Sequence, residues 1–282
     1  MKTKNLERQW VTLDACNVAY RQWGTTGKPI VLLHGIPMNS SLWERTGSKL
    51  STDGYLVYAP EMLGLGYTEG PIDYDHSLNG QARLVNLFIN KVVKDECILV
   101  GHDLGGGVAQ IIVTGFSSQV GIRKCVFTNC VGFDSWPVEK IKLLIGAAYK
   151  KNYAQIFSSE FIDSFIRKGL SAGLFNASLN TNELLGDLCG GLVGARERME
   201  HFVLFLKSMD NKYTQEASHK LKTFGQPALV IWADGDKFQP VSVGKKLRDI
   251  LPDATWKLIE GGHFHPLESD ALAEAIVQWD NS

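Results

Sequence analysis

Asp103 lies in a segment whose spacing is typical of a catalytic nucleophile. The segment Gly101-His102-Asp103-Leu104-Gly105-Gly106-Gly107 follows an apolar run, residues 97–100, and has the G-x-S-x-G form of a nucleophile elbow with aspartate in place of serine. A serine hydroxyl needs an adjacent base, whereas an aspartate with a pKa near ~3.9 is already an anion at neutral pH. A carboxylate that attacks a saturated, electrophilic carbon forms an alkyl ester, which water cleaves afterwards. The alternative is a glycine-rich helix start with Asp103 as its N-cap.

A second motif, His34-Gly35-Ile36-Pro37, follows the apolar run 30–33. A loop in this position supplies one backbone amide of an oxyanion hole, and the residue after the nucleophile supplies the other. We therefore expect the amides of Ile36 and Leu104 to hold developing negative charge. The alternative for this motif is an ordinary Gly-Pro turn.

A histidine pair follows the last predicted strand, in the sequence Gly261-Gly262-His263-Phe264-His265-Pro266. Imidazole has a pKa near ~6.5, which suits the removal of a proton from water at neutral pH. We favour His263 as this base, because the two preceding glycines free the loop to carry an imidazole over the sheet edge. His265 is expected to enter the following helix. The alternative for a loop histidine is a surface position without chemistry.

An acid that orients this histidine is expected in Trp232-Ala233-Asp234-Gly235-Asp236, which closes another predicted strand. A carboxylate at the second ring nitrogen holds the imidazole in place and stabilises its charged form. Asp236 is the predicted acid, and Asp234 is the competing residue. Both also suit a turn beside Gly235, whatever else they do.

Eight short strands are expected to position these loops. The first two form an antiparallel pair, and the other six alternate with helices. Such alternation favours a mostly parallel sheet covered by helices on both faces. The predicted strands are residues 10–14, 16–23, 30–33, 55–59, 97–100, 124–128, 228–232 and 255–259. The predicted helices are residues 40–50, 78–93, 104–116, 241–250 and 267–279.

One stretch, residues 135–211, shows helical periodicity without a convincing strand. Because the strand and helix alternation resumes at Pro227, we interpret this stretch as a helical cap inserted into a core formed by residues 1–134 and 212–282. Such a cap usually covers an active site and selects substrate. The alternative is a separate helical domain without a role in the chemistry.

Composition excludes several classes of function. With 282 residues, 44% hydrophobic content and a formal net charge of −1, the chain resembles an ordinary soluble globular protein and has no basic patch for nucleic acid or an anionic membrane. The residues before Arg8 are polar, and no run reaches the ~18 apolar residues of a membrane span, so neither a signal peptide nor a membrane segment is expected. The five cysteines lack metal-ligand spacing, which favours reduced, buried thiols in a cytoplasmic protein.

These ordered motifs closely resemble the α/β-hydrolase superfamily, and within it the aspartate-nucleophile branch of epoxide hydrolases, haloalkane dehalogenases and fluoroacetate dehalogenases. The resemblance implies an α/β-hydrolase fold, with a mostly parallel eight-stranded sheet flanked by helices and a helical cap. It also implies a two-step hydrolysis of a small-molecule substrate: Asp103 forms an ester, and His263, oriented by Asp236, activates the water that cleaves it. No metal and no organic cofactor is expected.

Two departures from the family pattern bear on the substrate. Haloalkane dehalogenases usually carry Trp after the nucleophile and often Asn after the His-Gly pair, where this chain has Leu104 and Ile36. Fluoroacetate dehalogenases carry Arg after the nucleophile, so Leu104 disfavours that activity too. Trp43, Trp136 or a residue of the predicted cap would have to replace the missing donors to a halide.

Epoxide hydrolases use cap tyrosines as donors to the ring oxygen, and Tyr149 and Tyr153 lie at helical spacing in the predicted cap. With His34, Trp43 and Trp136, they form the predicted set of substrate contacts. The preferred function is hydrolysis of a small apolar epoxide or related electrophile. The alternatives are a haloalkane dehalogenase, a lactonase or esterase with Asp103 as base, and a non-catalytic receptor of the same fold.

Overall fold

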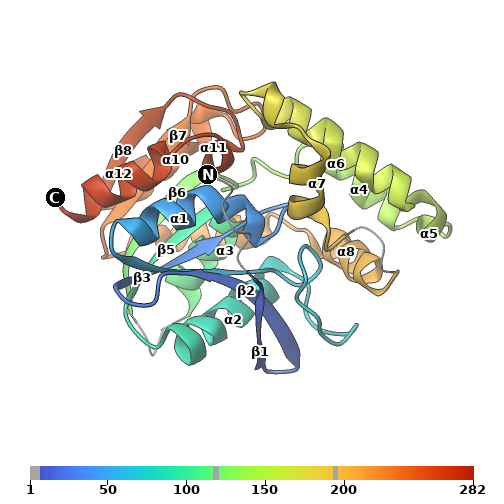
Figure 1. The fold of residues 1–282 in the computed structure, drawn as a ribbon, viewed down its shortest axis with the longest axis horizontal. Coiled ribbons are helices and arrows are strands. Elements are labelled where there is room, and N and C mark those ends of the chain that lie inside the picture. The colour runs from blue at the N-terminus through green and yellow to red at the C-terminus, as the bar shows by residue number, and fades with distance from the viewer. Residues whose placement is uncertain (1–6, 117–120, 193–195) are drawn as a thin grey trace.

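An eight-stranded, mostly parallel sheet forms the centre of the molecule (Figure 1). The computed structural model describes residues 7–116, 121–192 and 196–282, so the polar N-terminal segment before residue 7 lies outside the described residues. The strand order is β1-β2-β4-β3-β5-β6-β7-β8, and β1 and β2 are antiparallel to their neighbours. The bounds are β1 Gln9–Leu13, β2 Cys16–Trp23, β3 Lys28–Leu33, β4 Tyr55–Pro60, β5 Cys97–Asp103, β6 Ile122–Cys130, β7 Ala228–Ala233 and β8 Ala254–Ile259.

Helices flank this sheet in two groups of packed neighbours. In one group α1 packs against α12, and in the other α2, α3, α9 and α10 contact one another in sequence. Their bounds are α1 Glu44–Thr52, α2 Leu78–Phe88, α3 Leu104–Gly115, α9 Lys212–Leu221, α10 Val241–Ile250, α11 His265–Glu268 and α12 Ala271–Asp280. None of the helices in the described ranges combines the length and the apolar character that a bilayer crossing requires.

The central strands are buried on both faces, which explains their continuous apolar runs. Every residue of β5 and of β7 is buried, as expected for parallel strands between two layers of helices. All five cysteines are buried and unpaired, so the expected free thiols are present.

All eight predicted strands are present, and three helix predictions need correction. The predicted helix 40–50 divides into a 3-10 turn, Ser40–Trp43, and α1. The predicted helix 78–93 divides into α2 and a π-helical turn, Ile89–Val93. The predicted helix 267–279 is two helices, because Ser269 adopts an extended backbone conformation between α11 and α12.

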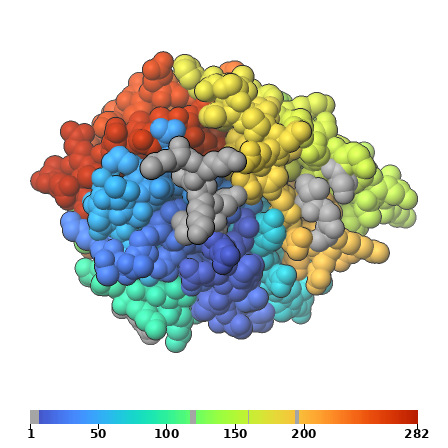
Figure 2. All heavy atoms as spheres, viewed as in Figure 1, coloured from blue at the N-terminus to red at the C-terminus, as the bar shows by residue number. Residues whose placement is uncertain are grey.

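The described part of the insertion between β6 and β7 contains helices and connecting loops and no strand. It contains α4 Glu139–Ala148, α5 Tyr153–Ile156, α6 Ser159–Gly173, α7 Asn182–Cys189 and α8 Arg196–Ser208. Figure 1 shows these helices, coloured lime to gold, gathered on one side of the sheet, and Figure 2 shows atoms of the same colours gathered on that side of the molecular surface. The next helix, α9, packs against α3 of the sheet domain, which supports placing the end of the proposed cap near residue 211.

Candidate active site

Asp103 is the last residue of β5 and stands on a sharp turn into α3. Its backbone has φ 51° and ψ −125°, a conformation that an L-residue adopts only when its surroundings enforce it. Glycines make this turn possible: a Cβ on Gly105 would lie 2.2 Å from the Leu33 carbonyl oxygen, and one on Gly106 would lie 2.1 Å from Cβ of Cys130. The sequence thus places the Asp103 side chain at the carboxyl edge of the sheet.

The Asp103 carboxylate binds the loop after β3. Its Oδ1 accepts a hydrogen bond from the backbone N–H of Ile36 at 2.9 Å. A Cβ on Gly35 would lie 2.1 Å from the same oxygen, so the loop approaches the carboxylate as closely as glycine permits. The side chain makes no capping hydrogen bond to α3, which differs from the N-cap alternative.

His263 connects two carboxylates. Its Nδ1 lies 2.8 Å from Oδ2 of Asp236, and its Nε2 lies 3.6 Å from Oδ2 of Asp103. Asp234 is exposed and is not the acid in contact with the imidazole. His265 begins α11 as expected, with Nε2 2.9 Å from the Thr128 hydroxyl.

Asp236 is held in place by three donors besides the histidine. The backbone N–H groups of Phe238 and Gln239 donate to Oδ1 at 2.7 and 3.0 Å, and the side-chain amide of Asn129 donates to Oδ2 at 2.6 Å. Asn129 also accepts from the Ala233 N–H at 2.9 Å, so it joins the ends of β6 and β7. Asn129 was not among the predicted site residues, although its place as a polar residue at the carboxyl end of a buried parallel strand was a signal for it.

The pKa values of the three groups follow from burial and from these contacts. Burial raises the pKa of Asp103, against the charge of His263 and the amides of Leu104 and Ile36. Burial would also raise the pKa of Asp236, but the charge and hydrogen bond of His263, with Gln239 and Asn129, lower it to about 2. Burial disfavours the charged form of His263, yet Asp236, with a smaller contribution from Asp103, raises its pKa above its ordinary value.

His102 occupies the unspecified second position of the elbow pattern, and its ring contacts the backbone of the loop that carries His263. Its Nε2 lies 2.8 Å from the backbone carbonyl oxygen of His263 and is placed to donate a hydrogen bond to it. Burial lowers the pKa of His102 well below its usual value, which keeps the ring neutral beside His263. The sequence analysis assigned His102 no role, because nothing in the elbow pattern specifies this position.

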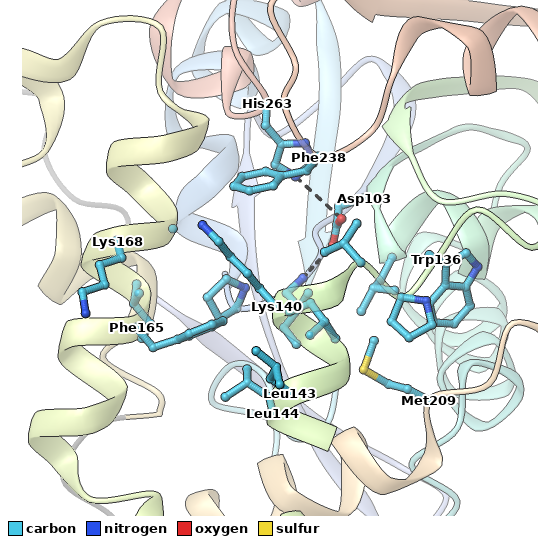
Figure 3. Close-up of a pocket in the computed structure, with 18 of the residues that line it drawn as sticks. Asp103, Trp136, Lys140, Leu143, Leu144, Phe165, Lys168, Met209, Phe238 and His263 are labelled. Atoms are coloured by element: carbon cyan, nitrogen blue, oxygen red, sulfur yellow. Dashed lines mark hydrogen bonds and ion pairs between the residues drawn. The ribbon is translucent and has the colours of Figure 1, made fainter. Parts of the chain in front are cut away.

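A cavity of about 420 Å³ opens over Asp103 and His263, between the sheet edge and helices α4 and α6 (Figure 3). Its size is ordinary for a small-molecule site. Most of its lining is apolar, including Leu144, Phe165 and Met209. The polar and charged side chains of its wall are few, namely Asp103, His263, Gln239, Lys140 and Lys168.

Of the predicted substrate contacts, Trp136 lines this cavity and the other four do not. The indole N–H of Trp136 donates to the Thr214 hydroxyl at 2.8 Å, so it is not directed at a substrate. His34 is fully buried, with Nδ1 near the Gly35 carbonyl and Nε2 accepting from the Met62 N–H.

The prediction that Trp43, Tyr149 and Tyr153 contact the substrate also needs correction, because none of the three lines the cavity. Trp43 is fully buried beside the ring of His102. Tyr149 is 65% exposed and donates its hydroxyl to the Lys207 carbonyl, while Tyr153 packs under the Lys207 ammonium. The helical spacing of the two tyrosines predicted a shared helix, but α4 ends before Tyr149 and α5 begins at Tyr153.

Among the residues that the structure describes, no group of three or more His, Cys, Asp or Glu side chains is arranged to hold a metal ion. Asp103, His263 and Asp236 instead contact one another in series, as nucleophile, base and acid do in hydrolases that work through a side-chain nucleophile.

Comparisons with known proteins agree with this architecture. The chain is 26% identical over 243 residues to a 2-hydroxy-6-oxononadienedioate/2-hydroxy-6-oxononatrienedioate hydrolase of Paraburkholderia phymatum, a match that covers 84% of this chain and 81% of the relative. It is 24% identical over 279 residues to haloalkane dehalogenase 2 of Mycobacterium tuberculosis, covering 96% and 94% of the two chains.

Solved structures show the same fold. An alpha/beta hydrolase fold protein from Burkholderia ambifaria superposes with a TM-score of 0.82 at 18% identity, covering 99% of this chain and 98% of the other. The haloalkane dehalogenase of Bradyrhizobium elkani superposes with a TM-score of 0.80 at 16% identity, covering 98% and 97%. The family model of the alpha/beta hydrolase fold matches residues 28–270. The chain therefore belongs to the α/β-hydrolase family.

Proposed function

We propose that this protein is a hydrolase in which Asp103 forms a covalent alkyl ester with a small, largely apolar epoxide or a related electrophile. In the first step Oδ2 of Asp103 attacks the electrophilic carbon, the carbon–oxygen bond of the ring breaks, and the ring oxygen takes a proton from solvent. Oδ2 is the attacking atom because Oδ1 is engaged by the Ile36 N–H.

In the second step water cleaves the ester. Neutral His263 takes a proton from water, whose oxygen attacks the carbonyl carbon of Asp103. The amides of Ile36 and Leu104 hold the resulting oxyanion, and Asp236 stabilises the imidazolium. The intermediate expels the product alkoxide, which receives the proton from His263. Asp103, left as the carboxylic acid, then ionises and releases one proton of the attacking water, which balances the proton taken up from solvent in the first step.

The observation that carries this proposal is the double orientation of Asp103. One carboxylate oxygen accepts from a backbone amide at 2.9 Å, while the other faces His263 Nε2 at 3.6 Å on the floor of an apolar cavity. A structural aspartate in an apolar interior would have both oxygens satisfied by donors, because an unpaired buried charge is costly. Here the second oxygen faces the imidazole beyond hydrogen-bond distance and borders the cavity.

Trapping tests the covalent route. With a panel of small epoxides, His263→Gln should accumulate Asp103 bearing the mass of one substrate molecule, whereas Asp103→Asn should gain no adduct. Wild type turning over in oxygen-18 water should incorporate label into the Asp103 side chain. Turnover without label or adduct would instead favour a lactonase or esterase in which Asp103 is a base. If wild type binds these small epoxides but does not turn them over, the protein would instead be a receptor.

A haloalkane dehalogenase is the second candidate, because the Mycobacterium relative with that name matches over 96% of this chain. In the described cavity wall, however, the one indole N–H is committed to Thr214. A halide would have to depend on backbone amides for stabilisation. The same trapping experiment with short haloalkanes, read by halide release, separates the two activities.

In the epoxide proposal the side-chain amide of Gln239 takes the place that the cap tyrosines were expected to fill. Gln239 lines the cavity with 3% of its surface exposed, and its amide nitrogen is the group that can donate. An amide donates a hydrogen bond to the opening ring oxygen without giving up its proton. Solvent then supplies the proton.

A further inference from the structure

Two ammonium groups stand on the cap side of the otherwise apolar cavity. Lys140 comes from the first turn of α4 and Lys168 from α6, and both side chains are exposed. Figure 3 shows Lys140 extending over the pocket and Lys168 at the edge that α6 forms, while Asp103 and His263 lie on the opposite side. The cavity wall therefore carries a buried negative charge at one end, on Asp103, and two exposed positive charges at the other, on Lys140 and Lys168.

Neither Lys140 nor Lys168 has a carboxylate partner in the described residues, in contrast to a neighbouring cation on each of the two helices. On α4, Lys142 pairs with Glu139 at 2.6 Å, and on α6, Arg167 pairs with Asp163 at 3.2 Å. Within the described ranges neither Lys140 nor Lys168 has an ion pair or a hydrogen bond, and apart from Asp103 no carboxylate lines the cavity. On these two helices, Lys142 and Arg167 are therefore paired with carboxylates, whereas the two lysines at the cavity are not.

From this arrangement we propose that the substrate is amphipathic, with an electrophilic carbon at one end, an apolar body and an anionic group, such as a carboxylate, at the other end. The inference rests on the proposed function for the role of Asp103. An anion beside the Asp103 carboxylate would be repelled, so the charged end lies at the mouth between Lys140 and Lys168. The apolar wall between the two ends binds the body of the substrate.

Equilibrium binding tests this without turnover. The probes are straight-chain alkyl carboxylates and the primary alcohols of equal length, titrated into wild type by calorimetry. Exposed ion pairs are weak individually, so carboxylates should bind roughly three- to tenfold more tightly than alcohols at low salt, with the preference shrinking at ~1 M salt. Lys140→Gln with Lys168→Gln should abolish the preference and leave alcohol affinity unchanged.

Lys142→Gln and Arg167→Gln are the matched controls, because they remove cations from the same two helices away from the cavity, and they should retain the preference. Equal affinity of wild type for carboxylates and alcohols would overturn the inference, as would a loss of affinity for both probes in the double lysine variant. An Asp103 adduct with neutral epoxides, found together with no carboxylate preference, would support the proposed function and reject this inference. The reverse result would reject only the covalent mechanism.

Turnover supplies a second arm. An epoxide with a terminal carboxylate should have a higher kcat/KM than its methyl ester, once its chain is long enough to reach from Asp103 to the lysines. The double lysine variant should remove this advantage through KM and leave kcat for the ester unchanged. An advantage for the carboxylate at every chain length, or one that survives in the double variant, would contradict the placement of the anion.

Discussion

Asn129 donates its side-chain amide to Oδ2 of Asp236 at 2.6 Å, the same oxygen that accepts from Nδ1 of His263. Asn129 also has φ 40°, a left-handed conformation that asparagine and glycine tolerate better than alanine. Asn129→Gly therefore removes the amide at little backbone cost, and Asn129→Ala adds backbone strain. Because hydrogen bonds to charged groups contribute about 1.5–3 kcal/mol, we expect the glycine variant to slow ester hydrolysis roughly tenfold or more.

Single-turnover kinetics after adduct formation measure this effect, and thermal unfolding measures the stability of the same variants. Adduct formation should proceed normally in Asn129→Gly, because Asn129 does not contact Asp103. If the two steps slow equally, Asn129 supports the fold rather than the orientation of the acid. Greater instability of Asn129→Ala than of Asn129→Gly would report the backbone strain.

The pH dependence of ester hydrolysis should follow His263. Asp236 raises the pKa of His263, and the reaction needs the neutral imidazole, so the rate should rise with pH through an apparent pKa above ~6.5. Asp236→Asn removes this charge and should shift the rising limb to lower pH while reducing the plateau rate, because the imidazole loses its orientation. Rates of decay of the trapped ester from pH 5 to 9 check both effects; an unshifted limb would exclude Asp236 as the partner.

The folding stability should depend on pH through the shifted pKa values of both His263 and Asp236. A raised folded-state pKa for His263 contributes stability that is complete below ~6.5 and is lost as pH rises through the folded value. The lowered pKa of Asp236, about 2 in the fold, contributes stability above ~3.9 that is lost as pH falls toward it. The Tm difference between wild type and Asp236→Asn should therefore be largest near pH 5 and should shrink at pH 3 and pH 9. A difference that does not vary with pH would contradict this coupling.

The fold and the loops at the sheet edge were predictable because local signals determine them. The buried run 97–100 and the glycines after Asp103 specify a strand and a sharp turn without knowledge of other elements. The end of β5 at Asp103 was missed, since polar residues at a carboxyl edge break the apolar pattern while the strand pairing with β6 continues.

The contacts of the helices inserted between β6 and β7 were not predictable, because the direction of a side chain depends on how helices pack. Helical spacing of Tyr149 and Tyr153 says nothing about a break between α4 and α5, and composition does not reveal that the Trp136 indole binds Thr214. Asn129 contacts Asp236, about a hundred residues further along the chain, and Gln239 lies in the wall of a cavity formed by several segments. Sequence periodicity describes neither relationship.

Gly35→Ala should disable the nucleophile by a steric clash. An added Cβ would lie 2.1 Å from Oδ1 and 2.4 Å from Cβ of Asp103, so either the carboxylate or the Ile36 loop must shift. Since a misplacement of about 1 Å can cost roughly a hundredfold in rate, adduct formation should fall by about that factor. Mass spectrometry of the adduct in the His263→Gln background measures the first step directly. An unchanged rate would show that the carboxylate does not react in this orientation.

Gln239→Leu should slow ring opening and leave ester hydrolysis unchanged, because the amide is proposed to donate to the leaving oxygen and not to the attacking water. Loss of a single donor to developing charge costs about a hundred- to a thousandfold in rate, and leucine keeps the apolar volume of the wall. Tyr149→Phe is the matched control: its hydroxyl donates to the Lys207 carbonyl at 3.0 Å outside the cavity, so its removal should change the rate less than twofold.

Rates of adduct formation with an epoxide and with an alkyl halide of equal size distinguish the role of Gln239. The halide leaves without a proton, so it should be less sensitive to Gln239→Leu than the epoxide is. Equal slowing of both would mean that Gln239 shapes the wall rather than assisting the leaving oxygen. If Tyr149→Phe slows the epoxide selectively, the cap tyrosine is the donor, and helices α4 and α5 must then rearrange to bring its hydroxyl into the cavity.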